Sequence, residues 1–159
     1  VAVNVRSTIL LNLLSYMTDK LLIEGNTVAA LDELYIWLSD NVAVGTTIIE
    51  YIRNCLKRVR KKESAMLLAS QNLEDFNQEG IRELTKPLFA IPPHQFLFNA
   101  GAVDKKFYME ALQLEESEYN LIRFPQRGVC LYRCGNERYL LEVHAPAYKE
   151  ALFGKAGGR

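Results

Sequence analysis

The sequence predicts an α/β protein with a mostly parallel sheet flanked by helices. Two observations lead to this prediction. Short, uniformly apolar runs alternate with segments of helical periodicity through the first hundred residues. The final third then contains two short helical segments and a hairpin pattern. Because 159 residues suffice for one domain with a substantial core, we expect residues 1–159 to form a single domain.

The first part of the chain contains two predicted strands and the helix between them. Val1–Val5 reads as a short strand, and the apolar residues of 7–23 keep near-helical spacing, with Gly25 placed as a C-terminal cap. Thr27–Leu31 is uniformly apolar after its first residue, which is typical of a strand buried on both faces. These elements would form the first unit of the sheet.

The next unit begins with a second predicted helix. Thr47 and Glu50 form a capping-box pattern, which predicts a helix start, and this helix ends in the basic sequence KRVRKK. Residues 64–70, SAMLLAS, predict another buried strand, and the helix after it is expected to end near Thr85.

The last part of the chain is predicted to be partly antiparallel. Residues 94–100 predict a strand, and two short helices follow in DKKFYMEAL and EESEYNLIR. The segments GVCLYRC and ERYLLEVHA are joined by Gly135-Asn136, which predicts an antiparallel hairpin at one edge of the sheet. Pro146 begins a final helical turn that Gly154 closes.

Composition excludes several classes of function. Nineteen basic residues balance nineteen acidic ones, so any contact with nucleic acid or membrane must come from a local patch. No apolar run is long enough to span a membrane. The three cysteines, Cys55, Cys130 and Cys134, form no disulfide framework, which favours a reducing, cytosolic setting. Their spacing relative to His94 and His144 is not that of a zinc site.

Two adjacent acids follow the first buried strand. In open α/β sheets, ligands bind beyond the carboxyl ends of the strands, where Asp32 and Glu33 are expected to lie. One carboxylate there could orient Mg²⁺ through its water shell while the other polarises an attacking water. The alternative is that both acids simply begin a helix, where carboxylates interact favourably with the helix dipole.

A polar amide follows the second buried strand. Ser70 and Gln71 come directly after LLA, so Gln71 could sense a γ-phosphate or hold a water molecule. The alternative is a plain loop start. The helix before this strand is rich in bases, which would form a solvated helix end, an arginine finger or a contact to the DNA backbone. Its basic residues are Arg53, Lys57, Arg58, Arg60, Lys61 and Lys62.

These features occur together in a known order. The segments ALDE, VRKK and LASQN resemble, in order and spacing, the large ATPases of type IV secretion and conjugative transfer, the VirB-four/TraC/TrbE class. In that class a Walker B strand ends in Asp-Glu, an Arg-Lys pair follows, and a Gln comes eleven residues after the Arg. QFLFNAG, ALQLEESEYNLIR and the hairpin extend the resemblance over almost the whole chain.

The resemblance implies a RecA-like fold and a role for each residue. Asp32 would organise Mg²⁺, Glu33 would activate water, Ser70 and Gln71 would contact ATP, and Arg60 would act on a neighbour's nucleotide. The whole protein would be a ring-forming, hexameric ATPase at the cytoplasmic face of a membrane secretion channel. Its partners would be further subunits and channel and coupling proteins. The remaining bases of the helix would contact either DNA or another subunit: Arg53, Lys57, Arg58, Lys61 and Lys62.

The sequence departs from the family pattern in two places. Leu34-Tyr35 stands where the family has Ala-Trp, and no G-x-x-x-x-G-K-[ST] phosphate loop is present. We therefore expect residues 1–159 to be the C-terminal portion of the motor domain and to be inactive alone. The rival interpretations are a fragment that only oligomerises, a DNA-binding module that uses the basic helix, and another metal phosphohydrolase.

Overall fold

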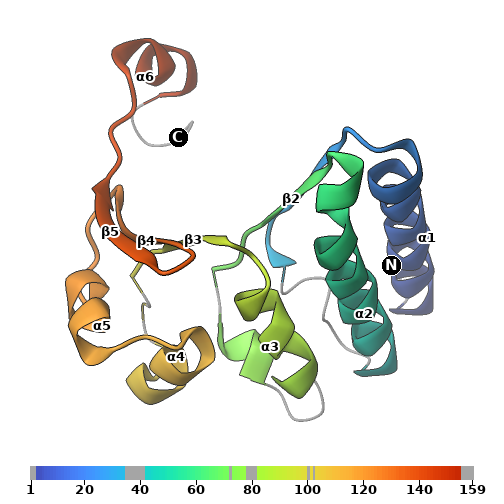
Figure 1. The fold of residues 1–159 in the computed structure, drawn as a ribbon, viewed down its shortest axis with the longest axis horizontal. Coiled ribbons are helices and arrows are strands. Elements are labelled where there is room, and N and C mark those ends of the chain that lie inside the picture. The colour runs from blue at the N-terminus through green and yellow to red at the C-terminus, as the bar shows by residue number, and fades with distance from the viewer. Residues whose placement is uncertain are drawn as a thin grey trace.

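The computed structural model describes residues 3–34, 42–71, 73–77, 82–99, 101 and 103–154, and it confirms the α/β class. The first half contains α1 (Val3–Asp19), β1 (Val28–Leu31), α2 (Val42–Arg58) and β2 (Ala65–Leu68) (Figure 1). The second half contains α3 (Arg82–Ala90), β3 (His94–Leu97), α4 (Lys105–Leu112), α5 (Glu116–Ile122), β4 (Val129–Cys134), β5 (Glu137–Glu142) and α6 (Ala147–Phe153).

The described strands form two sheets. β1 and β2 pair in parallel, with Val28 opposite Ala65 and Leu31 opposite Leu68. β3, β4 and β5 form an antiparallel sheet in that order, which confirms the predicted hairpin. Its predicted position at an edge of the parallel sheet is wrong among the described strands, because β4 pairs with β3 in a sheet separate from β1 and β2. Among the described residues the parallel part of the fold is this single β1–β2 pair.

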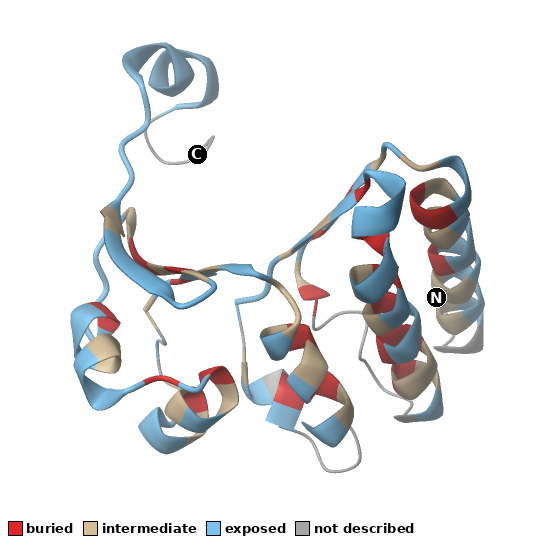
Figure 2. Ribbon diagram, viewed as in Figure 1, coloured by how far each residue is buried: buried red, intermediate tan, exposed pale blue. Residues whose placement is uncertain are grey.

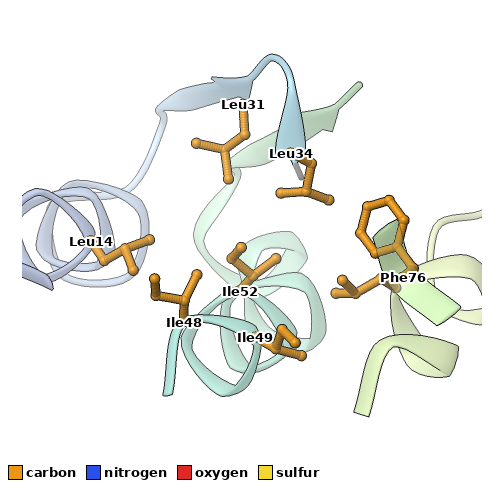
Figure 3. Packing of buried hydrophobic residues seen from close by; sticks show 8 residues of the cluster. Leu14, Leu31, Leu34, Ile48, Ile49, Ile52 and Phe76 are labelled. Atoms are coloured by element: carbon orange, nitrogen blue, oxygen red, sulfur yellow. The ribbon is translucent and has the colours of Figure 1, made fainter. Parts of the chain in front are cut away.

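The main hydrophobic core lies between α1, α2 and the parallel strands. It contains Leu14, Leu31, Leu34, Ile48, Ile49, Ile52, Phe76 and Leu88 (Figure 3). Burying a side chain of this size stabilises the fold by roughly 1.5–3 kcal/mol. A second cluster, formed by Leu97, Tyr108, Leu112, Leu114, Ile122 and Leu131, joins the antiparallel sheet to α4 and α5. These cores fix the strands whose ends carry the candidate site.

The prediction that the strands are buried on both faces is wrong for this chain. Val28 of β1 is 66% exposed and Leu67 of β2 is 62% exposed, whereas Ala29 and Leu31 are buried. The reason is that the main core packs α1 and α2 against the inward-facing residues of the pair, and the other residues are left exposed, as Figure 2 shows for the strands. Both faces of the strands carry apolar residues, but the rest of this chain packs against only one face of the pair.

Three predicted element boundaries are also wrong. Val3 to Val5 belong to α1, in which the helix satisfies its own backbone groups. Thr47 lies inside α2, which begins at Val42, and its hydroxyl donates to the Ala43 carbonyl at 3.1 Å.

The third wrong boundary is the end of α3. The helix passes Thr85 and Pro87 and ends at Ala90. Buried Thr85 donates to the Phe76 carbonyl at 3.2 Å, and Leu88 is buried in the main core. We attribute the longer helix to this packing, which outweighs the backbone hydrogen bond that Pro87 cannot make.

The predicted residues at helix ends are confirmed for the first and the last helix. Gly25 (φ 75°) ends the first helical segment, whose last residues, Lys20–Glu24, form a π-helical turn. Pro146 and Gly154 bound α6, which projects from the rest of the fold and contains no buried residue. None of the described helices is both long and apolar enough to cross a membrane.

Candidate functional site

The carboxyl ends of β1 and β2 lie at the same edge of the parallel pair. The in-register pairing ends with Leu31 opposite Leu68, so Asp32-Glu33 and Ser70-Gln71 both follow at that edge. This confirms the predicted placement of the acids beside Gln71. It does not by itself test the role of any of these residues.

The Asp32-Glu33 segment is held between two hydrogen bonds to the neighbouring strand end. The Ala69 N–H donates to the Leu31 carbonyl, and the Leu34 N–H donates to the Ala69 carbonyl, each at 2.9 Å. Leu34 is only 4% exposed and packs in the main core. The segment is therefore fixed by backbone pairing on both sides and by a buried side chain after it.

Glu33 has an unusual backbone conformation. Its φ of 51° lies in the left-handed region, which costs a residue with a side chain about 1–2 kcal/mol. The Asp32 Oδ1 atom accepts a hydrogen bond from the Glu33 N–H at 2.9 Å, which supports this conformation. The turn separates the two acids: the Asp32 carboxylate is exposed, whereas Glu33 is half-buried.

The side chains of Glu33 and Gln71 are in direct contact. The Gln71 Nε2 group donates a hydrogen bond to Glu33 Oε1. The other carboxylate oxygen, Glu33 Oε2, is shut off from solvent and has no hydrogen-bond partner among the described residues. A carboxylate in this setting can accept a proton or a further hydrogen bond from a group that enters the site.

The site residues fit a hydrated Mg²⁺ ion better than a protein-enclosed one. In the described ranges no three His, Cys, Asp or Glu side chains come together as a metal cluster. Mg²⁺ keeps several waters and usually takes one or two carboxylates, with substrate phosphates completing its shell. Asp32 offers such a carboxylate, since among the described residues the one hydrogen bond to it comes from the Glu33 N–H, to Oδ1.

Arg60 lies at the other end of the strand pair. Residues Val59–Lys62 form a 3₁₀ turn directly before β2, and the Asn26 N–H donates to the Lys62 carbonyl at 2.9 Å before β1 begins. Four strand residues separate the two ends, which is about 13 Å at 3.3 Å per residue. The structure therefore does not bring Arg60 to Asp32, Glu33 and Gln71 within one chain.

The predicted basic segment is solvent-accessible. Arg53 is half-buried and the other five bases are exposed, and none of the six forms an ion pair with a described residue. Their charges are therefore available for contacts with another molecule. The exposed members are Lys57, Arg58, Arg60, Lys61 and Lys62.

Arg133 is a buried charge that sequence reasoning missed. It is 9% exposed, and its guanidinium donates to the Leu112 carbonyl at 2.6 Å and to the Gln95 side chain. Burial lowers the pKa of Arg133. Because Leu112 ends α4, Arg133 stabilises the negative end of that helix. A cavity of about 610 Å³ between α3 and α4 lies beside it, and of the predicted site residues only Lys57 lines it, while Asp32, Glu33, Arg60 and Gln71 do not. The one feature of the sequence that could have indicated this role is that Arg133 occupies an inward-facing position of the predicted strand that contains it.

The fold is that of a fragment like the type IV secretion ATPases, which confirms the resemblance drawn from the sequence. One solved structure that it matches is VirB4 of Thermoanaerobacter pseudethanolicus, with a TM-score of 0.76 and 25% sequence identity. The match covers 87% of this chain and 37% of VirB4, so the chain spans about a third of that protein's length. No protein-family model and no curated protein sequence matches the chain.

Proposed function

We propose that residues 1–159 are the Walker B side of a motor ATPase of type IV secretion, which couples ATP hydrolysis to channel assembly or to transfer of DNA or protein. The observation that carries this proposal is the joint placement of Asp32, Glu33 and Gln71 at the carboxyl edge of β1 and β2. The structural match to VirB4 supports the same class.

In this proposal the residues at the carboxyl edge of β1 and β2 have different roles in ATP hydrolysis. Asp32 would hold the water shell of Mg²⁺, which supplies charge neutralisation at the phosphates when it is bound. Glu33 would accept a proton from the attacking water, and Ser70 and Gln71 would contact the phosphates. Asp32 stays exposed to solvent while Glu33 is half-buried, which suits one carboxylate for a hydrated ion and the other for a proton.

Arg60 would serve a neighbouring subunit. It lies in the turn before β2, so the length of the strand, about 13 Å, separates that end of the pair from the end that carries Glu33. An arginine that is exposed, unpaired with described acids and remote from its own site suits action in trans, in a ring-forming and hexameric assembly. That assembly would work at the cytoplasmic face of the membrane.

A second candidate function uses the same basic segment. Six bases without ion pairs to described residues favour a contact to the DNA backbone or to another subunit. Arg53, Lys57, Arg58, Lys61 and Lys62 would share this contact with Arg60. It would add to the ATPase function or, in a chain that does not hydrolyse ATP, replace it.

The experiment compares Mg-ATP binding and hydrolysis by chain 1–159 and by the full-length protein that contains it. Chain 1–159 lacks a phosphate loop, which makes most phosphate contacts in such enzymes, so we expect weak or no binding by calorimetry. The full-length protein should hydrolyse Mg-ATP. Tight binding by chain 1–159, or no hydrolysis by the full-length protein, would contradict the proposal.

A further inference from the structure

The contact between Gln71 and Glu33 joins two strand ends that are far apart in the sequence. Their side chains meet because β1 and β2 pair in parallel and end together. Glu33 Oε1 accepts the Gln71 amide hydrogen bond, while Oε2 faces a solvent-free position without a donor among the described residues. The carboxylate is thus turned toward the protein rather than toward water.

The backbone around Glu33 is held in place, so the orientation of its carboxylate can change only by rotation of the side chain. The Asp32 Oδ1 contact and the Leu34–Ala69 hydrogen bond hold the main chain at both sides of Glu33. Rotation about the Glu33 side-chain bonds can still move the carboxylate outward. The inward position loses hydration at Oε2, and the hydrogen bond from Gln71 compensates part of that loss.

We infer that Gln71 is a positioning residue that holds Glu33 turned inward until a phosphate engages Gln71. An incoming γ-phosphate is a strong acceptor for the Gln71 amide N–H. When Gln71 turns to the phosphate, Glu33 loses its donor and its carboxylate moves out to meet water. Glu33 therefore becomes available only when a triphosphate is bound. This inference rests on the proposed function, because it assigns the regulation of that same site.

Carboxyl footprinting tests the resting contact in chain 1–159. The protein is treated with a water-soluble carbodiimide and glycine ethyl ester, and each modified carboxylate is quantified by mass spectrometry. Losing one hydrogen bond shifts an equilibrium by roughly 2- to 12-fold, so Gln71→Ala should raise Glu33 modification by about that factor. Asp32 and Glu63, which are both exposed, are the internal controls and should not change.

A second variant guards against a general loosening of the fold. Gln71→Met keeps the length of the side chain without its donor, and it should give the same increase. If Glu33 modification stays at the wild-type level in both variants, the inference is overturned. It is also overturned if Asp32 and Glu63 increase in parallel with Glu33, because the effect would then not be specific to the contact.

The phosphate dependence is measured in the full-length protein. Glu33 modification with a non-hydrolysable ATP analogue should exceed that with ADP, each with Mg²⁺, because both nucleotides shield the site similarly and differ in the γ-phosphate. Gln71→Ala should remove this difference. Equal modification in the wild type would overturn the inference. If instead Glu33→Gln left hydrolysis unchanged, the proposed function would fail while the footprint still reported the contact.

Discussion

The Leu34 N–H donates a hydrogen bond to the Ala69 carbonyl at 2.9 Å, which ties the end of β1 to the end of β2 immediately after the two acids. Leu34 also places its side chain in the main core (Figure 3). One residue therefore fixes both the backbone and the packing of the turn that carries Asp32 and Glu33. The predictions below begin with this residue.

Leu34→Ala should destabilise the chain by about 2–5 kcal/mol, because it removes a buried side chain and leaves a cavity. Urea unfolding monitored by circular dichroism measures this change. Leu121→Ala is the control, since Leu121 is 49% exposed and its loss should cost much less. Equal effects of the two substitutions would show that Leu34 is not a core anchor.

Glu33→Gln should abolish ATP turnover in the full-length protein while nucleotide binding remains. The amide keeps the shape of the side chain but cannot take a proton from water, and general-base catalysis typically contributes about 10²–10⁴-fold. Glu63→Gln is a matched control, because Glu63 is also a glutamate with left-handed backbone (φ 52°) but lies at the other end of the strand pair. Turnover that falls equally little in both variants would make Glu33 a turn residue only.

Arg60→Ala should remove ATPase activity in the full-length assembly and leave nucleotide binding intact. An arginine finger is worth roughly 10³–10⁵ in rate, whereas a DNA-contacting arginine shares its task with neighbours. Steady-state ATPase assays and nucleotide titrations measure both quantities. Lys61→Ala, one residue away in the same turn, is the control and should retain activity.

Subunit mixing tests whether Arg60 acts in trans. Mixing Arg60→Ala with an excess of Glu33→Gln subunits should restore partial activity, because some interfaces pair an intact Glu33 with an intact Arg60. A mixture that stays inactive despite confirmed subunit exchange argues against trans action. ATPase activity that survives in Arg60→Ala while DNA binding is lost would assign the segment to nucleic-acid contact.

Stability should fall between about pH 10 and pH 12 because of Tyr108. Burial raises the pKa of Tyr108 to about 12, so in this window the unfolded chain ionises the phenol and the folded chain does not. The stabilisation is therefore complete below pH 10 and is lost as pH rises, by about 2–3 kcal/mol in total. Urea unfolding across this range should show the loss.

Tyr108→Phe should remove that pH dependence. It should also cost about 1 kcal/mol near neutral pH, because the Tyr108 hydroxyl donates to the Phe98 carbonyl at 2.9 Å. Tyr148→Phe is the control, since Tyr148 is exposed on α6. A slope that persists unchanged in Tyr108→Phe would assign it to other groups.

Local patterns in the sequence were sufficient for most elements and for the order of the site residues. The apolar runs before Asp32 and Ser70 predict β1 and β2, and the Gly135-Asn136 turn predicts the hairpin. These features depend on neighbours along the chain, so a short window contains the information. The placement of Glu33 beside Gln71 also followed, because parallel strands joined by a helix end at one edge.

Tertiary structure decided what depends on partners elsewhere in the chain. The extension of α3 past Pro87 reflects the packing of buried Thr85 and Leu88, and no local window contains that information. The left-handed Glu33 and the solvent-free position of its Oε2 atom likewise occur in a turn that the Leu34 N–H ties to Ala69 at the end of the other strand. The sequence specifies which side chains follow a strand, but the packing of the strands determines which way a carboxylate faces and what it contacts.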